Sequence, residues 1–195
     1  MSDFSPNVVI VAGPNGSGKS TAAPSLLRDY LGLTEFVNAD VIAQGLSGFQ
    51  AEAVAIRAGR IMQARLRELA SQRRDFAFET TLASRSFAPW LRELRYSGYR
   101  AHLLFLWLSS PELAISRVAA RVQQGGHHVQ EETVRRRYRR GLQNFFKLYR
   151  PIVDSWVLFD NGSEGGRQQI ASYIGGEELH ISNVRLWDTI RGQYA

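Results

Sequence analysis

One short stretch limits what this chain can fold into more than any other. It is GPNGSGKS at residues 13–20, with VVIVA directly before it and TAA directly after it. The apolar run predicts a buried strand, and the residues after the loop predict the start of a helix. The spacing G-x-x-x-x-G-K-S between a strand and a helix is that of a nucleotide phosphate-binding loop. We therefore expect an α/β unit with a phosphate site.

The residue types in this loop follow from what phosphate binding requires. Glycines adopt backbone angles that are closed to other residues, which lets successive N–H groups turn towards a phosphate. The helix N-terminus behind them adds partial positive charge. Lys19 is expected to reach the terminal phosphates and the Ser20 hydroxyl to ligate Mg²⁺. The expected nucleotide-binding set is Gly13, Pro14, Asn15, Gly16, Ser17, Gly18, Lys19, Ser20 and Thr21.

Composition narrows the class of protein. The 195 residues are 44% hydrophobic, which predicts one domain over residues 1–195 with a sizeable core. No window reaches the ~18 apolar residues of a membrane span, and the first residues lack the pattern of a secretory signal. With no cysteine, disulfides and Cys-based zinc sites are excluded. We expect a cytoplasmic protein without membrane contact. The net charge of +6 favours binding of polyanions such as nucleotide phosphates.

Strand and helix patterns alternate along the chain, which predicts a mostly parallel central sheet with helices on both faces, a three-layer α/β fold. Strands are predicted at residues 8–12, 35–38, 75–79, 100–108 and 156–160. Helices are predicted from the loop to about 30, and at 51–74, 87–96, 111–124 and 131–149, with distortion at Pro24. A small appendage at about 168–195 is predicted to hold a hairpin, 170–174 with 179–182, and a last helix capped by Asn183.

Polar residues follow two further strands of the predicted sheet. Asp40 follows the second strand, and Glu79, Thr80 and Thr81 stand at the end of the third. Ligands of open α/β sheets bind at the carboxyl ends of the strands, so we expect these groups beside the phosphate loop. Asp40 can accept a proton from an acceptor hydroxyl, or equally can cap a helix at 41–44. Glu79 and Thr81 can hold an acceptor by hydrogen bonds, and Glu79 can instead act through the metal. Alternatively, both residues only make turn contacts after the strand. An unpaired carboxylate at the end of a buried strand costs free energy, which favours a functional role for Glu79.

Arginines are frequent in the second half of the chain. Arg117 and Arg121 lie four residues apart and share one face of a helix. They either stabilise charge on a transferred phosphoryl group or lie on a solvated edge of the helix. Between two arginine-bearing helices lies QQGGHHV at 123–129, which predicts a lid over about 117–140 that closes on the phosphates. The adjacent His127 and His128 are a weak signal for zinc, and a polar role in the lid is favoured.

The run RRRYRR at 135–140 does not form one patch. At about 100° per residue, Val134 and Tyr138 mark a buried stripe, and Arg135 lies nearest to it. Arg137 and Arg139 are expected on its two sides, with Arg136 and Arg140 towards solvent.

Taken in order, these segments resemble the zeta toxin family of P-loop kinases. The resemblance rests on the phosphate loop, VNAD at 37–40, FETTL at 78–82, PELAI at 111–115 and the Gly-Gly-His segment, and covers about residues 7–160. It is closest to short stand-alone bacterial members. The resemblance implies a toxin of a toxin–antitoxin pair, which uses ATP and Mg²⁺ to phosphorylate UDP-N-acetylglucosamine or a related UDP-amino-sugar, with a protein antitoxin as partner.

The resemblance also implies residue roles. Asp40 would be the catalytic base, Lys19 and Ser20 would bind phosphate and metal, Glu79 and Thr81 would contact the acceptor, and Arg117 would face the ATP phosphates. Larger members have a second lid arginine where this chain has 125–129; Arg121 or Arg135 is the expected substitute. They also have an arginine near the position of Ala83, for which Arg85 is the nearby candidate.

The residues alone do not exclude two other classes of function. The basic charge and the arginine run are compatible with a polynucleotide-type kinase or a nucleic-acid-bound regulator, although the aromatic residues there fall on the buried stripe rather than on a stacking surface. A nucleotide-gated interaction protein would use the same loop to hydrolyse ATP and would need no acceptor pocket. A kinase for a small hydroxyl-bearing acceptor is the leading hypothesis.

Overall fold

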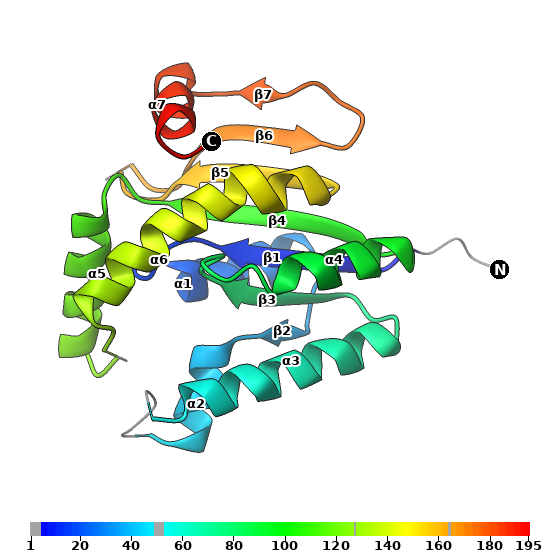
Figure 1. The fold of residues 1–195 in the computed structure, drawn as a ribbon, viewed down its shortest axis with the longest axis horizontal. Coiled ribbons are helices and arrows are strands. Elements are labelled where there is room, and N and C mark those ends of the chain that lie inside the picture. Colours follow the sequence, from blue (N-terminus) through cyan, green and yellow to red (C-terminus); the bar gives the residue numbers. More distant parts are fainter. Residues whose placement is uncertain (1–4, 49–52, 127, 164) are drawn as a thin grey trace.

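A seven-stranded sheet forms the centre of the computed structural model, which describes residues 5–48, 53–126, 128–163 and 165–195 (Figure 1). The elements are β1 (Asn7–Ala12), α1 (Lys19–Ala23), η1 (Pro24–Tyr30), β2 (Phe36–Val37), α2 (Ala39–Leu46), α3 (Ala55–Ser71), β3 (Phe76–Thr80), α4 (Phe87–Tyr96), β4 (Arg100–Trp107), α5 (Pro111–Gln123), α6 (Glu131–Asn144), η2 (Phe145–Tyr149), η3 (Arg150–Ile152), β5 (Ser155–Asp160), β6 (Gln168–Ile174), β7 (His180–Ile181) and α7 (Val184–Tyr194).

The strand order is β2-β3-β1-β4-β5-β6-β7, and both outer strands have only two residues. Strands β1 to β5 run parallel, whereas β6 and β7 are antiparallel additions. Ala12 at the end of β1 pairs with Thr80 of β3 and with Phe105 of β4. Because the strands are parallel and in this register, the loops that follow β1, β2 and β3 meet at one edge of the sheet.

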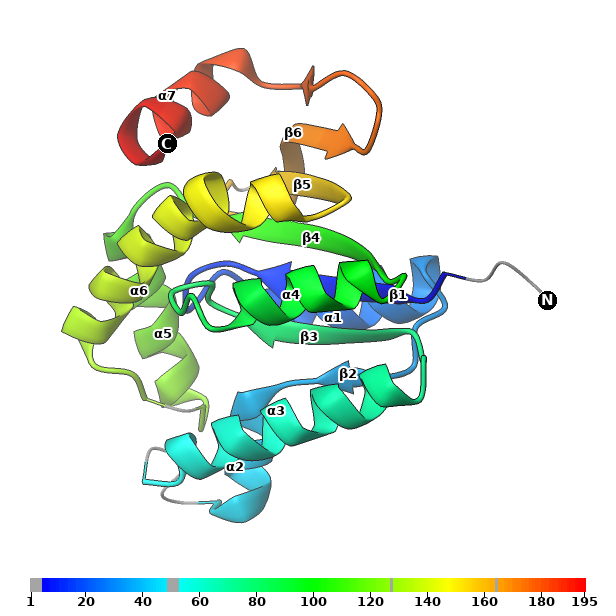
Figure 2. The same ribbon diagram turned by 45° about the vertical axis from the view of Figure 1, so that its right-hand side comes forward.

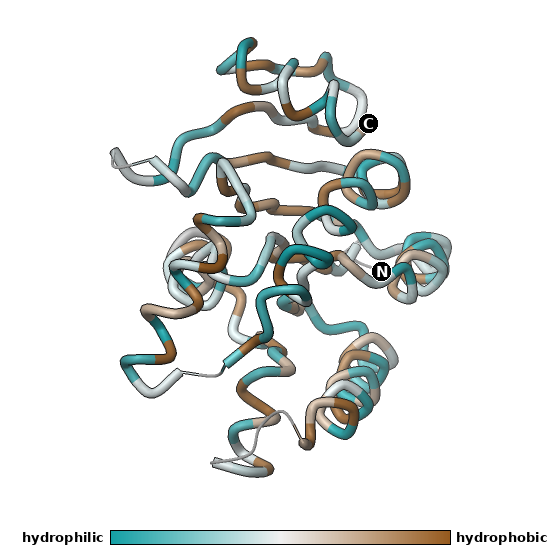
Figure 3. The backbone as a smooth tube through the Cα atoms, turned by 60° about the vertical axis from the view of Figure 1, so that its left-hand side comes forward, coloured by the Kyte–Doolittle hydropathy of each residue, from teal (hydrophilic) through white to brown (hydrophobic). Residues whose placement is uncertain are grey.

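Helices cover both faces, as predicted (Figure 2). Successive residues of a strand point to opposite faces. Val8 and Ile10 therefore join the large core under α3, α4 and α6, while Val9 and Val11 join a smaller core under α1 and η1. The helices show mixed hydropathy along their coils, as expected for elements with one face on the core (Figure 3).

The structure refines the predicted geometry of three helices. Pro24 ends α1, and the chain continues as the wider π-helical segment η1, which confirms the expected distortion. The helix predicted over 131–149 ends at Asn144 and continues as η2, also π-helical. The helix predicted from residue 51 begins at Ala55, and residues 49–52 lie outside the described part.

The predicted C-terminal hairpin is present. Strand β6 pairs antiparallel with β5 on one side and with β7 on the other, so the appendage extends the central sheet. Asn183 caps α7 with its side-chain oxygen, which accepts from the Leu186 N–H at 3.1 Å. Trp187 of α7 stacks on Trp156 of β5 with ring centroids 5.7 Å apart, which ties the last helix to the core. Among the described residues, no helix is both long and apolar enough to cross a membrane.

Candidate active site

The loop after β1 has the backbone conformation that its glycines were predicted to allow. Gly13, Gly16 and Gly18 have φ angles of 143°, 76° and 78°. A Cβ at position 13 would lie 2.3 Å from the Leu106 carbonyl oxygen, and one at position 16 would lie 2.7 Å from that of Ala114. Both substitutions would collide with backbone. Glycine is thus required for conformation and for close packing on β4 and α5.

Lys19 is buried at the start of α1, with 6% of its surface exposed. Its Nζ donates to the Pro14 carbonyl oxygen at 2.8 Å and lies 3.7 Å from Glu79 Oε1. Burial lowers the pKa of Lys19, and the Glu79 charge opposes this shift. A lysine held in this way at the phosphate loop, and lining the cleft, is suited to contact an anionic ligand there.

A hydrogen-bond network joins the three strand-end loops. Ser20 Oγ donates to Glu79 Oε2 at 2.7 Å, and Asn38 Nδ2 donates to the same oxygen at 2.8 Å. The Asn38 side-chain oxygen accepts from the backbone N–H of Asp40 at 2.7 Å and of Val41 at 3.4 Å. Asn38 is therefore the N-cap of α2. The alternative in which Asp40 caps this helix is wrong: Asp40 is the second residue of α2, and it lines the cleft.

A cleft of about 890 Å³ opens above this network. Its floor is the phosphate loop and the start of α1, and one side carries Asp40, Glu79, Thr80 and Thr81. The polar residues predicted at the ends of three strands are thus brought to one cavity. Arg85 is not among the lining residues; its neighbours Ser84 and Ser86 are.

Hydrogen bonds from α6 and η2 anchor the loop after β3. Asn144 Nδ2 donates to the Leu82 carbonyl oxygen at 2.7 Å, and Tyr149 Oη donates to the Ser84 carbonyl oxygen at 2.6 Å. Burial raises the pKa of Tyr149 to about 12. Gly141 lies so close that a Cβ there would be 2.4 Å from the Thr81 carbonyl oxygen. Leu82 is fully buried with a φ of 55°, a strained conformation for leucine that these contacts maintain.

The opposite wall of the cleft is basic. Arg117 lines it and donates to the carbonyl oxygens of Asn161 at 2.8 Å and Gly162 at 3.5 Å, which fixes its guanidinium next to the phosphate loop. Arg121 lines the same wall one helical turn later. Both α5 arginines are therefore at the cleft, and neither is merely a solvated edge.

Helix α6 contributes arginines other than the one expected. Arg135 pairs with Glu112 of α5, and the two helices α5 and α6 are in contact. Arg135 does not line the cleft. Arg137 does, and it makes a long 3.5 Å hydrogen bond to Asn15 Oδ1. Burial lowers the pKa of Arg137, and the Asp40 charge opposes this.

Arg136 and Arg140 are exposed, as predicted, but they also line the cleft. They share one side of α6 with Arg137, at spacings of three and four residues. Helical angles correctly placed these side chains off the buried stripe. They gave no information on which solvent-facing side of α6 would border the cleft, because that depends on how α6 crosses the strand ends.

The donor atoms at the loop fit Mg²⁺. Ser20 Oγ and the Glu79 carboxylate are hard oxygen ligands, and they lie together at the base of the cleft. In the described part of the chain, no group of three or more His, Cys, Asp or Glu side chains is placed to hold a metal. This small donor set suits Mg²⁺, which is usually held by one or two carboxylates and by the phosphates of its substrate. His127 of the expected lid lies outside the described residues.

Comparison with known proteins agrees with this geometry. The family model described as Zeta toxin matches residues 1–164. An uncharacterized protein of Haemophilus influenzae is 29% identical over 130 residues, which are 67% of this chain and 91% of that protein.

Among solved structures, a chain of the AvrRxo1-ORF1:AvrRxo1-ORF2 complex matches with a TM-score of 0.78 and 18% identity, over 95% of this chain and 63% of that one. The present chain thus spans somewhat less than two thirds of that protein. A chain of the PezAT chromosomal toxin–antitoxin system of Streptococcus pneumoniae matches with a TM-score of 0.69 and 16% identity, over 100% of this chain and 80% of that one. At these identities the two structures establish the fold alone, a mostly parallel sheet covered by helices.

Proposed function

Since this chain belongs to the zeta toxin family, we propose that it transfers the γ-phosphoryl group of ATP to a hydroxyl of a small acceptor. The observation that carries the proposal is the placement of two carboxylates, Asp40 and Glu79, in one cleft with the phosphate loop. A protein that only hydrolyses ATP has no need of a polar surface on the far side of that loop.

Different residues that line the cleft would have different roles in phosphoryl transfer. The loop N–H groups, Lys19 and Ser20 would hold the ATP phosphates, and Arg117, Arg121 and Arg137 would stabilise charge on the transferred group. When bound, Mg²⁺ would be held by Ser20 and, directly or through water, Glu79, and would neutralise phosphate charge. As the acceptor oxygen bonds to the γ-phosphorus, the bond to the bridging oxygen of ADP breaks and Asp40 takes the hydroxyl proton.

Asp40 is oriented for this role by the backbone, because Asn38 holds the first turn of α2. The acceptor itself would rest on Glu79, Thr80 and Thr81. We further propose a UDP-N-acetylglucosamine-like sugar nucleotide as acceptor and a role as the toxin of a toxin–antitoxin pair. Membership of the family supports both, and the fold likeness to a chain of the PezAT toxin–antitoxin system is consistent with the second.

Mass spectrometry of reactions with ATP, Mg²⁺ and a panel of nucleotide sugars tests the activity. Asp40→Asn should abolish the phosphorylated product while ATP binding is retained. Asp188→Asn is the matched control, because Asp188 is an exposed carboxylate on α7. A normal rate of transfer by the Asp40 variant would show that another group is the base.

Growth tests the toxin role separately. Expression of the chain without a partner should slow growth, and Lys19→Ala should relieve the effect. Lys147→Ala is a suitable control because Lys147 is exposed on η2 and does not line the cleft. Equal growth of the wild type and the Lys19 variant would contradict a toxic kinase activity.

The nucleic-acid alternative is less well supported. Tyr138, Phe145 and Tyr149, which lie in and after the arginine run, are at most 2% exposed and belong to the core. They are not available to stack with bases. Binding of single-stranded RNA that weakens steeply with salt would restore this alternative.

A further inference from the structure

The turn that follows β5 contacts the phosphate loop at residues that do not line the cleft. Asn161, the first residue after β5, donates from its side-chain Nδ2 to the Ser17 carbonyl oxygen at 2.7 Å. A carbonyl oxygen only accepts hydrogen bonds, so the amide nitrogen of Asn161 must face it. Neither Asn161 nor Ser17 lines the cleft, whereas the next residue, Gly18, does. This hydrogen bond can therefore affect a ligand only through the loop.

The sheet fixes the position of Asn161. Strand β4 lies between β1 and β5 (Figure 1), and the Asn161 N–H donates to the Trp107 carbonyl oxygen at the end of β4 at 3.0 Å. The phosphate loop passes closely over the same strand end, where Gly13 packs on the Leu106 carbonyl oxygen. The contact itself is equally close, because a Cβ at position 18 would lie 2.9 Å from Asn161 Nδ2. Asn161 is thus anchored by its backbone, and its side chain packs directly on the loop.

The geometry of the peptide bond connects this contact with the ligand site. In a trans peptide, the carbonyl and the following N–H point in opposite directions. No peptide bond of the described residues is cis. Because the Ser17 carbonyl points towards Asn161, the Gly18 N–H points the other way, towards the cleft that Gly18 lines. The side chain of Asn161 therefore determines that a donor, and not an acceptor, is presented to a phosphate.

Glycine at position 18 makes this peptide easy to rotate unless another group holds it. Gly18 has φ 78° and ψ 20°, and glycine enters the left-handed region and the ordinary regions at similar cost. Rotation of the Ser17–Gly18 peptide would replace the N–H at the cleft by a carbonyl oxygen. Carbonyl and phosphate oxygens are both acceptors, so the rotated loop would bind phosphate less tightly. The hydrogen bond from Asn161 opposes the rotation.

The same turn also holds Arg117. The Arg117 guanidinium donates to the carbonyl oxygens of Asn161 at 2.8 Å and of Gly162 at 3.5 Å. Asp160 is 6% exposed and accepts from the Gly162 N–H at 2.8 Å and from Ser163 Oγ at 2.5 Å, which stabilises the turn that carries both carbonyls. Asn161 thus contacts the phosphate loop with its side chain and the arginine wall of the cleft with its backbone.

We propose that Asn161 is a positioning residue of the phosphate site. Its side chain holds the Ser17–Gly18 peptide with the N–H towards the nucleotide phosphates, and its carbonyl oxygen holds Arg117 beside them. The inference rests on the proposed function in that it takes the loop as the ATP site. Asn161 acts through these groups and has no contact with the nucleotide. Its side chain has to donate a hydrogen bond, so a carboxylate of the same shape cannot replace it.

Binding without turnover tests this role. Calorimetry measures the affinity for ADP and for a non-hydrolysable ATP analogue, each with Mg²⁺. Asn161→Ala leaves the peptide free to rotate and should weaken the binding of both. Asn161→Asp places an acceptor against the Ser17 carbonyl and favours the rotated peptide, whose N–H the carboxylate accepts. This variant should lose the most affinity, about 10- to 150-fold, as expected when one hydrogen bond to a charged group is lost.

The NMR spectrum of the glycine amides separates positioning from a loss of stability. In wild-type protein labelled with ¹⁵N-glycine, the Gly18 amide proton should shift downfield when ADP binds, because it forms a charge-assisted hydrogen bond. The shift should be reduced in Asn161→Ala and absent in Asn161→Asp. Asn183→Ala is the matched control, because Asn183 also makes a side-chain hydrogen bond to the backbone, at 3.1 Å, but caps α7 and does not line the cleft. It should lower stability and leave both the affinity and the Gly18 shift unchanged.

Several results would overturn the proposal. They are equal nucleotide affinity in the wild type and in Asn161→Asp, an undiminished Gly18 shift in that variant, and a loss of affinity in Asn183→Ala as large as that in Asn161→Ala. Nucleotide binding that depends on Asn161, without phosphoryl transfer to any compound, would contradict the proposed function and leave the positioning role in place. Phosphoryl transfer with unchanged nucleotide affinity in both Asn161 variants would do the reverse. No nucleotide binding by the wild type at about 1 mM would contradict both.

Discussion

Asn38 bonds the Glu79 carboxylate and caps the helix that carries Asp40, and two replacements of Asn38 separate these contributions to stability. The side chain is 6% exposed. Its oxygen caps α2, and its Nδ2 donates to Glu79 at 2.8 Å. Asn38→Ala removes the cap and the bond to a carboxylate together. We expect the free energy of unfolding to fall by about 2–5 kcal/mol, from about 0.5–2 for the cap and about 1.5–3 for the charged hydrogen bond.

Asn38→Asp removes only one of these contributions. The carboxylate still accepts from the backbone of α2, so the cap is retained. The donor that faced Glu79 becomes a second carboxylate at hydrogen-bond distance, and two such charges repel strongly. A proton shared between them relieves this repulsion. The deficit of the aspartate variant should therefore be smaller at about pH 5 than at about pH 8, whereas that of the alanine variant should be similar at both.

Urea unfolding followed by circular dichroism measures these differences, with EDTA present and nucleotide absent so that ligand binding does not contribute. The wild type at each pH is the reference. A loss below about 0.5 kcal/mol for the alanine variant would show that the network is not structural. A deficit of the aspartate variant that is independent of pH would show that position 38 and Glu79 do not interact in solution.

Three further predictions test other parts of the chain. Burial lowers the pKa of His102 below its ordinary 6.5, although the charge of Asp154 acts in the opposite direction. The unfolded chain therefore binds more protons than the folded chain just below pH 6.5, and the free energy of unfolding should fall as the pH drops through this range. The fall should be smaller in the His102→Gln variant. Gly141→Ala places a Cβ 2.4 Å from a backbone oxygen of the loop after β3 and should cost about 1–3 kcal/mol, whereas Gly192→Ala, with open space around its Cβ, should be neutral or stabilising in the same thermal-unfolding assay. Arg137→Ala should lower the rate of phosphoryl transfer by about 100-fold or more, and Arg135→Ala should change it little; equal losses in a steady-state assay would contradict the placement of α6.

Much of the site could be predicted because its chemistry is local in sequence. The phosphate loop needs glycine at set positions, and the loops that follow parallel strands must meet at one edge of a sheet. Asp40, Glu79 and Thr81 were found by this reasoning. Asn38 was missed as a member of the hydrogen-bond network, although asparagine just before a helix is a strong N-cap signal, because the predicted strand 35–38 included it and Asp40 was the candidate cap.

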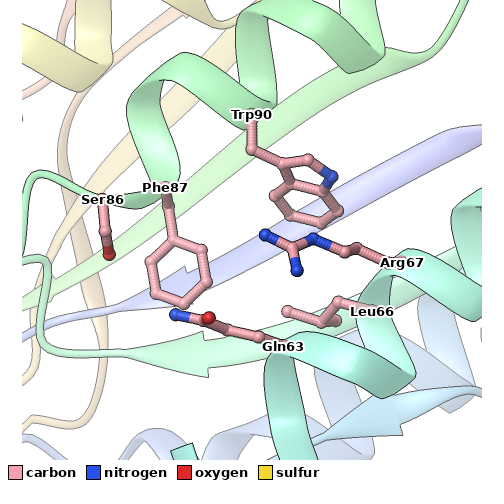
Figure 4. A pocket seen from close by; sticks show the side chains of 6 residues that line it. All are labelled: Gln63, Leu66, Arg67, Ser86, Phe87 and Trp90. Atoms are coloured by element: carbon pink, nitrogen blue, oxygen red, sulfur yellow. The ribbon is translucent and has the colours of Figure 1, made fainter. Parts of the chain in front are cut away.

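The arginines illustrate what sequence could not provide. Periodicity shows which side of a helix is buried, and it placed Arg135 close to the apolar stripe. Whether that edge meets a neighbouring helix or a cleft depends on the packing of α5 against α6, a tertiary contact between residues far apart in the chain. A small pocket between α3 and α4, lined in part by Phe87 and Trp90 (Figure 4), was also not predicted, because these two residues have the spacing of ordinary core residues and their exposed sides appear only once α3 is in place.

The two outermost strands have a consequence for association with other chains. Each free edge of the sheet consists of only two residues, Phe36–Val37 at one side and His180–Ile181 at the other. An incoming strand would find few unpaired backbone groups at either edge, so aggregation by strand addition is disfavoured. A protein partner would accordingly have to recognise side chains on the helices and loops, and the arginines that line the cleft offer positive charge for such recognition.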